Sequence, residues 1–382
     1  MTGQQSSIDA VKNRLAMRAG FAFIGGIVLS IFLGADKFQW DAQTYWWAGR
    51  AWWLGQQAYD PEVLSKLAGK NILPFVYPPT ILPFLGVISI LPEAFFLALF
   101  PLSKVVVFYL LLRCWNEILR TDRARLLWFS LLGFQGALFI DFRAGNVSVF
   151  EALLIWIGLK AWIDERPLAF AVPIVLVGQV KILPLAFLGL FLWDKRHGWS
   201  RILLAVGVLG AANGLMIWLW PDRWRLFGHV LTLIEESGAT NPCQLEFWKS
   251  LIGASAGFWL YCGFSLVVAR LTWQMGNSAA KTGTEGRRRA VFLACLTYAL
   301  LAPRFKDYSF LLLIPSAIGS FDLNFRSKFL EWSFLAFGLV PLTPLPKIIP
   351  GFTGYIPVAW VVFFWLFTIL SERNYQKSLN SL

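Results

Sequence analysis

The stretch 93–112, EAFFLALFPLSKVVVFYLLL, carries only Lys104 as a charge after its first residue. A helix of about 20 mainly apolar residues crosses the hydrocarbon core of a bilayer, which is about 30 Å thick. The whole chain of 382 residues shares this bias, since 57% of its residues are hydrophobic and 15% are charged. A soluble domain is roughly half apolar and a quarter charged. The composition excludes a disordered protein, a coiled coil and an ordinary cytosolic enzyme, and it predicts a polytopic membrane protein.

Comparable apolar runs recur along the chain. We expect an all-α single domain over residues 1–382, built as a bundle of about 12–13 transmembrane or re-entrant helices. Residues 1–20 are polar and basic, and no small-x-small cleavage site follows, which predicts an uncleaved first span with the amino terminus inside. The expected segments are 20–35, 80–91, 93–112, 126–140, 147–163, 168–180, 182–193, 201–220, 250–271, 290–302, 308–320, 329–341 and 356–371.

The net charge of +12 is unevenly shared between two sets of loops. Of the 34 Lys and Arg residues, 21 lie in one set and 12 in the other, with Lys104 inside a span. The positive-inside rule makes the richer set cytoplasmic and places the long loop 35–75 outside. The charge is therefore attributed to a multi-pass protein of the inner cell membrane and not to nucleic-acid binding. The richer set is 1–20, 113–125, 160–167, 194–201, 270–289, 322–328 and the tail after 370.

This sidedness requires an odd number of crossings between the loops 35–75 and 113–125, yet two apolar runs lie between them. We therefore suspect that the Pro-rich stretch from Tyr77 to Pro92 is re-entrant, because backbone that breaks at membrane depth is tolerated where it lines a cavity. A genuine spanning hairpin is the alternative.

The loop 35–75 is expected to contain a helix on the outer leaflet. Asp41, Tyr45, Ala48 and Trp52 recur at the spacing of one helical face. The surrounding tryptophans are typical of a membrane interface. Asp41 is either presented to a substrate or merely caps the helix, since Asp is a favoured N-cap residue.

Cations lie next to apolar runs at two places on the outer side, as the single Lys181 and as the pair Arg304 and Lys306. Lys181 has apolar neighbours, so it should face a cavity and meet an anion, unless it snorkels to the interface. Lys104 invites the snorkelling interpretation more strongly. The segment Pro303-Arg304-Phe305-Lys306-Asp307 can bind phosphate or form a solvated turn with an internal ion pair.

The unusual polar residues gather at the outer ends of spans, which predicts a pocket at the outer membrane face. The four cysteines are scattered, only two histidines occur, and no outer motif pairs acidic residues with another good ligand, so we expect no metal and no cofactor. A metal held by Asp36 with Asp41 is the alternative. The polar residues in question are Asp41, Arg143, Asn146, Gln179, Lys181, Asn241, Gln244, Arg304, Lys306 and Asp307.

This arrangement resembles glycosyltransferase family 87 over residues 36–320. The similar motifs are Trp40-Asp41-x3-Tyr45 with Gly55-x3-Tyr59-Asp60, Tyr77-Pro78-Pro79 with Leu91-Pro92, Gly145-Asn146, Lys181-x2-Pro184, Asn241-Pro242-Cys243-Gln244, and Pro303 with Lys306-Asp307-Tyr308. Two positions depart from the family pattern: the His expected near residue 306 is absent, and Cys243 replaces a polar residue.

The resemblance implies a GT-C fold and a transfer reaction on the outer face from a polyprenyl-phosphate-mannose-like donor, with Asp41 as catalytic base. The chemistry agrees, because nucleotide sugars stay in the cytoplasm and no Gly-rich nucleotide motif is present. A carboxylate can deprotonate the hydroxyl of a lipid- or glycan-linked acceptor, cations can stabilise the leaving phosphate, and one attack inverts the anomeric carbon. The rival from another class is a transporter or flippase for a lipid-linked sugar, which would place its charges near the midplane.

The candidate site residues follow from these roles. Asp41 is the candidate base; the donor phosphate is assigned to Lys181, Arg304, Lys306 and Arg143; and the substrate-binding candidates are Tyr45, Tyr77, Asn146, Gln179, Gln244 and Asp307.

Overall fold

The computed structural model describes residues 2–34, 37–194, 198–233, 241–324, 327–343 and 348–380. These residues fold into helices without any strand. In chain order they are α1 Thr2–Leu33, α2 Trp40–Trp53, α3 Pro61–Ala68, η2 Pro79–Ile81, α4 Leu82–Ile88, α5 Glu93–Leu119, α6 Arg123–Ala144, α7 Ser148–Ile163, α8 Pro167–Gly178, η3 Leu183–Trp193, α9 Gly198–Leu219, α10 Pro221–Leu233, α11 Gln244–Ile252, α12 Ala254–Ala279, α13 Gly283–Leu301, η5 Asp307–Leu313, α14 Ile314–Asn324, α15 Lys328–Phe337, η6 Val340–Leu342, α17 Pro350–Thr353 and α18 Ile356–Asn380.

Six of the described helices are long and apolar enough to cross a membrane, namely α1, α5, α6, α9, α12 and α18. Three shorter apolar helical segments, Pro79–Ile88, Pro167–Gly178 and Leu183–Trp193, add to them. The prediction of an all-α polytopic membrane protein is confirmed.

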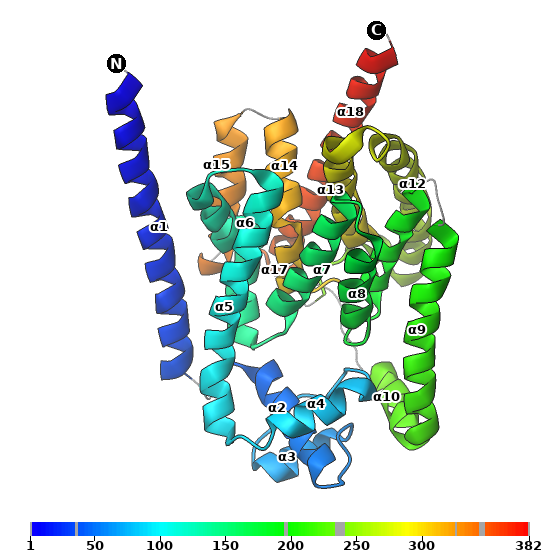
Figure 1. Cartoon of the computed structure of the whole chain (residues 1–382). Helices are drawn as coiled ribbons and strands as arrows, with labels where there is room; N and C mark the ends of the chain where they lie inside the picture. The colour runs from blue at the N-terminus through cyan, green and yellow to red at the C-terminus, as the bar shows by residue number, and fades with distance from the viewer. Residues whose placement is uncertain are drawn as a thin grey trace.

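The segment between the first outer loop and α5 does not cross the bundle. The helices α2, α3 and α4 form a layer with α10 at one end, and both chain termini lie at the opposite end (Figure 1). Helix α4 has 7 residues, and at 1.5 Å per residue it is only about 10 Å long. Between Tyr77 and α6, only α5 runs from this layer to the other end of the bundle (Figure 1), which agrees with one crossing in this segment and disfavours the alternative of a spanning hairpin.

Close packing of α2 on α4 holds this end layer together. A Cβ added at Gly49 would meet the backbone carbonyl of Leu85, and one added at Gly86 would meet the ring of Trp52. Glycine at both positions thus allows the two helices to approach closely.

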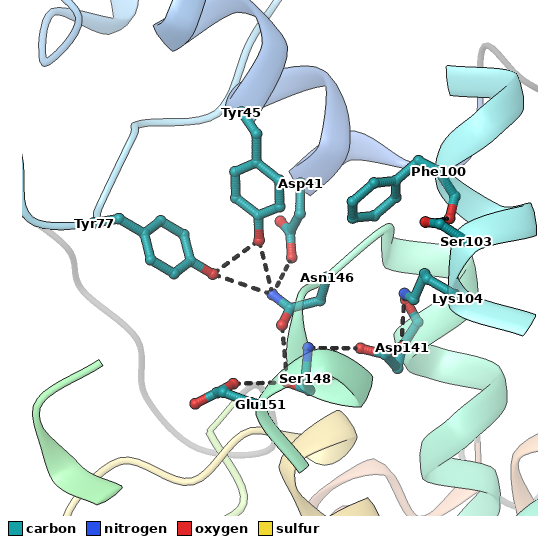
Figure 2. Close-up of polar contacts among 10 residues, drawn as sticks. All are labelled: Asp41, Tyr45, Tyr77, Phe100, Ser103, Lys104, Asp141, Asn146, Ser148 and Glu151. Atoms are coloured by element: carbon teal, nitrogen blue, oxygen red, sulfur yellow. Dashed lines mark hydrogen bonds and ion pairs between the residues drawn. The ribbon is translucent and has the colours of Figure 1, made fainter. Parts of the chain in front are cut away.

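The buried side chains form a large cluster in the bundle and a smaller one in the end layer. In the bundle, the Phe134 and Phe334 rings lie 5.1 Å apart. The end layer buries Tyr45, Tyr77 and Leu82. The candidate site lies where this layer meets the ends of α6 and α7 (Figure 2).

Candidate active site

Asp41 does not cap helix α2. The N-cap is Gln39, which has φ 59° and makes no side-chain capping bond. Its backbone N–H donates to the Arg143 carbonyl at 2.8 Å, and its side-chain amide donates to the Leu97 carbonyl at 3.0 Å. Because Gln39 anchors the helix start, the carboxylate of Asp41, two residues further on, is available for another role.

Asp41 is bound by the turn that joins α6 to α7. The Asn146 amide nitrogen donates to Oδ2 of Asp41 at 2.6 Å, and Asn146 is 1% exposed. Gly145 before it has φ 68°, and a Cβ there would lie 2.9 Å from the Ala42 Cβ. The pair Gly145-Asn146 thus lets this turn approach α2 closely enough to orient the carboxylate.

Two buried tyrosines complete the polar cluster (Figure 2). The hydroxyl groups of Tyr45 and Tyr77 lie 2.8 Å apart, and the Asn146 amide nitrogen lies 3.3 Å and 3.5 Å from them. Tyr59 donates to the Tyr77 backbone carbonyl at 2.8 Å. The Tyr45–Tyr77 contact thus holds the segment before Pro78 and Pro79 against α2. Both tyrosines adjoin Asn146, so the three residues form one network.

A chain of contacts links Asn146 to Lys181. The Ser148 hydroxyl donates to the side-chain oxygen Oδ1 of Asn146 at 2.8 Å and lies 3.5 Å from Oε2 of Glu151. Glu151 in turn pairs with Lys181 at 2.6 Å. The expectation that Lys181 meets an anion is confirmed, and that anion is a carboxylate of the chain itself.

The electrostatic surroundings suit Asp41 to proton transfer. Burial raises the pKa of the Asp41 carboxyl, while the Asn146 hydrogen bond and the charges of Lys181, Lys104 and Lys306 lower it, with burial prevailing. Burial also raises the pKa of Tyr45 well above its ordinary value, so its hydroxyl stays neutral. A carboxylate with a raised pKa is a stronger base than an exposed one.

Lys104 and Asp141 form a buried ion pair that the sequence did not indicate. Both side chains are 0% exposed, and Lys104 Nζ lies 2.6 Å from Asp141 Oδ2. The expectation that Lys104 snorkels is wrong, because α6 brings a carboxylate to it. The other oxygen, Asp141 Oδ1, accepts from the Ser148 backbone N–H at 3.2 Å, so the pair supports the turn that carries Asn146.

Of the remaining cationic candidates, Lys306 lies near Asp41 and Arg143 lies at the exposed surface. Lys306 lies near enough for its charge to act on Asp41, and the backbone of its loop is held by Asn241, whose side-chain oxygen accepts from the Phe305 N–H at 3.0 Å. Arg143 is exposed, with its guanidinium over the Trp40 ring at 5.8 Å.

Three further candidates lie on the segments around this cluster. The Gln179 carbonyl accepts from Thr80 at 3.3 Å. Gln244 is buried at the start of α11, and Asp307 begins η5. Within the described residues, no group of three or more His, Cys, Asp or Glu side chains is placed to hold a metal ion.

The helical bundle and its long apolar helices define an integral membrane protein. Its polar site, made of a carboxylate, an amide and two tyrosines, lies at one end of the bundle. The family model of glycosyltransferase family 87 matches residues 75–303, more than half of the chain, and the chain belongs to that family. It is therefore a membrane glycosyltransferase, which disfavours the transporter alternative. No curated protein and no solved structure matches the chain.

Proposed function

We propose that the protein transfers a mannose-like hexose from a polyprenyl-phosphate donor to a lipid- or glycan-linked acceptor on the outer face of the membrane, with Asp41 as the general base. The observation that carries this proposal is the Asp41 carboxylate held by Asn146 at 2.6 Å and surrounded by positive charges.

The proposed step is a single displacement. Asn146 binds Oδ2 of Asp41, and we assign the proton transfer to the other oxygen, Oδ1. Oδ1 of Asp41 takes the proton of the acceptor hydroxyl. At the same time the acceptor oxygen bonds to the anomeric carbon of the donor sugar, and the bond from that carbon to the phosphate oxygen breaks. The bonding electrons leave with the polyprenyl phosphate, and the anomeric configuration inverts.

Lys181, Lys306 and Arg304 are the proposed partners of the donor phosphate. Lys181→Ala should weaken donor binding by roughly tenfold or more, because a charge-assisted hydrogen bond contributes about 1.5–3 kcal/mol. Lys181→Arg should recover part of it. The matched control is Lys70→Ala, which removes a lysine paired with Glu93 at 3.0 Å at the same end of the bundle. Binding of labelled polyprenyl-phosphate hexoses to purified protein measures the effect, and equal losses in both alanine variants would contradict it.

An apolar cavity supports a lipid-linked donor. It has a volume of about 270 Å³ and lies between η3, α12 and α13. Its lining begins at Leu183, two residues after Lys181, and continues along η3 to Trp193. We propose that the polyprenyl chain lies in this cavity, because its start adjoins the cation assigned to the phosphate.

Filling the cavity should discriminate between donors by chain length. Gly189 lines it, and a Cβ there would meet nothing within 4 Å. Gly189→Leu should raise the KM for a long-chain polyprenyl-phosphate donor several-fold and leave a short-chain donor nearly unaffected. Gly210→Leu on α9, also with open space around its Cβ, is the control. Equal effects on both donors would show that the chain lies elsewhere.

The proposed sidedness places the α2–α4 layer outside. A cysteine replacing Gly69, at the end of α3, should react with an impermeant thiol reagent in intact cells. One replacing Gly283, at the start of α13, should react only after permeabilisation, since the two positions lie at opposite ends of the bundle (Figure 1). The reverse pattern would place the site in the cytoplasm.

A further inference from the structure

A second cavity, of about 430 Å³, lies at the end of the bundle opposite Asp41. It is formed where α7 leads into α8 and α12 leads into α13, with Asp194 after η3 and Arg201 in α9. We infer that this cavity binds a phosphate group, carried by an anionic lipid or by a soluble anion.

The charges of the cavity favour an anion. Four cations line it, Arg166, Arg201, Lys281 and Arg287, against two carboxylates, Glu165 and Asp194. The carboxylates are already engaged: Arg287 lies 3.3 Å from Glu165 and 3.0 Å from Asp194, and Arg201 lies 3.2 Å from Asp194. Among the described residues that line the cavity, the cations therefore exceed the carboxylates by two.

Arg166 and Lys281 are the cations that an anion can use. Arg166 is 70% exposed and approaches Asp164 only at 4.0 Å. Lys281 is exposed and forms no ion pair within the described part of the chain. Neither would have to break a close internal pair to contact a ligand.

The backbone adds further hydrogen-bond donors, and the wall of the cavity holds one of its cations. The first residues of α8 and α13, Pro167 and Gly283, line the cavity. Pro167 itself has no N–H, but the start of a helix favours anions through the helix dipole and the unpaired N–H groups of its first turn. Trp162 and Trp193 also line it and are 1% and 7% exposed. The Arg287 guanidinium lies over the Trp162 ring at 4.8 Å, which holds this cation in the wall of the cavity.

Phosphate is the anion that best fits this set of groups. A phosphodiester has acceptor oxygens only and a free phosphate ion has mostly acceptors, and the planar arginine guanidinium matches the geometry of both. Basic cavities between membrane helices near the cytoplasmic surface bind lipid headgroups. The cavity lies at the ends of α9 and α12, two of the helices long enough to cross a membrane, so a lipid phosphate can reach it from the side and a soluble one from water.

The test uses the purified full chain after delipidation in detergent. The thermal unfolding midpoint is followed against dioctanoyl phosphatidylglycerol, with dioctanoyl phosphatidylcholine as the zwitterionic comparison. A parallel series follows it against inorganic phosphate, with chloride at equal ionic strength. A saturable shift with phosphatidylglycerol alone identifies a lipid headgroup, and one with inorganic phosphate identifies a soluble anion. Either outcome supports the inference.

Matched double variants locate the effect. Arg166→Gln with Lys281→Gln should lower the affinity for the bound probe by about tenfold or more, the loss expected for charge-assisted contacts. Arg120→Gln with Lys328→Gln removes an exposed Arg and an exposed Lys at the same end but outside the cavity, and should leave the affinity unchanged. Equal weakening in both double variants, or no saturable shift of the wild type with either probe, would overturn the inference. Neither readout depends on sugar transfer.

Discussion

Asp41→Asn is expected to lower turnover by roughly 10²- to 10⁴-fold, the contribution of a well-placed general base, while the protein still folds and binds donor. Asparagine keeps the shape of the side chain and can still accept the Asn146 amide hydrogen, but it cannot take a proton. The measurement is the transfer rate at saturating donor with purified protein, with the unfolding midpoint as the check on folding. Transfer at the wild-type rate would refute the role.

The pH profile gives the same hypothesis a second readout. Burial raises the pKa of Asp41 above the usual value of a carboxyl. The base must be ionised, so kcat/KM of the wild type should be lost as the pH falls through this raised pKa. The residual activity of Asp41→Asn should lack that limb.

Asp60→Asn is the matched control for Asp41→Asn. Asp60 caps α3, and its Oδ1 accepts from the N–H groups of Glu62 and Val63 at 2.9 Å and 3.4 Å. Asn is an equally good N-cap, so transfer by Asp60→Asn should stay close to that of the wild type. Asp36, which lies in the same loop before α2, would be a second control, but it lies outside the described residues.

The local features of the site could be predicted from the sequence because they depend on nearby residues. The spacing of Asp41 and Tyr45 predicted one face of a helix, and α2 confirms the helix. The contact between Asp41 and Asn146 joins positions 105 residues apart, which spacing alone cannot predict. The family match begins at residue 75, so Asp41 lies outside it, and the fold connects Asp41 to the matched region through Asn146.

The sequence could not predict the charged partners inside the bundle. Glu151 lies within an expected apolar span, and only the turn after α8 brings Lys181 to it. Lys104 has no acidic residue near it in its own run, and Asp141 reaches it from another helix. Helix α6 is also broken at residues 133–136, where Phe134, Gln135 and Gly136 have positive φ values, although the run 126–140 predicted one continuous helix. Such features depend on packing between helices, which the pattern of one segment does not contain.

Lys104→Met is expected to lower the free energy of unfolding in detergent by about 3–5 kcal/mol, because it leaves the buried Asp141 carboxylate without its counter-charge. The control is Lys160→Met. Lys160 pairs with Asp164 at 3.1 Å, with the two side chains 32% and 31% exposed, and such a surface pair contributes about 1 kcal/mol or less. An equally small loss for Lys104→Met would mean that the buried pair does not stabilise the fold.

Combining Lys104→Met with Asp141→Leu separates stability from activity. Replacing both charges of a buried pair with apolar side chains is often neutral, so the double variant should recover much of the free energy of unfolding that Lys104→Met loses. The Ser148 N–H would still lose the Asp141 Oδ1 acceptor at 3.2 Å, and Asn146 two residues earlier would lose its support against Asp41. Transfer should therefore remain low in a protein that is again stable. If transfer recovered together with stability, Asp141 would serve only to neutralise Lys104, and the α6–α7 turn would hold Asn146 in place without it.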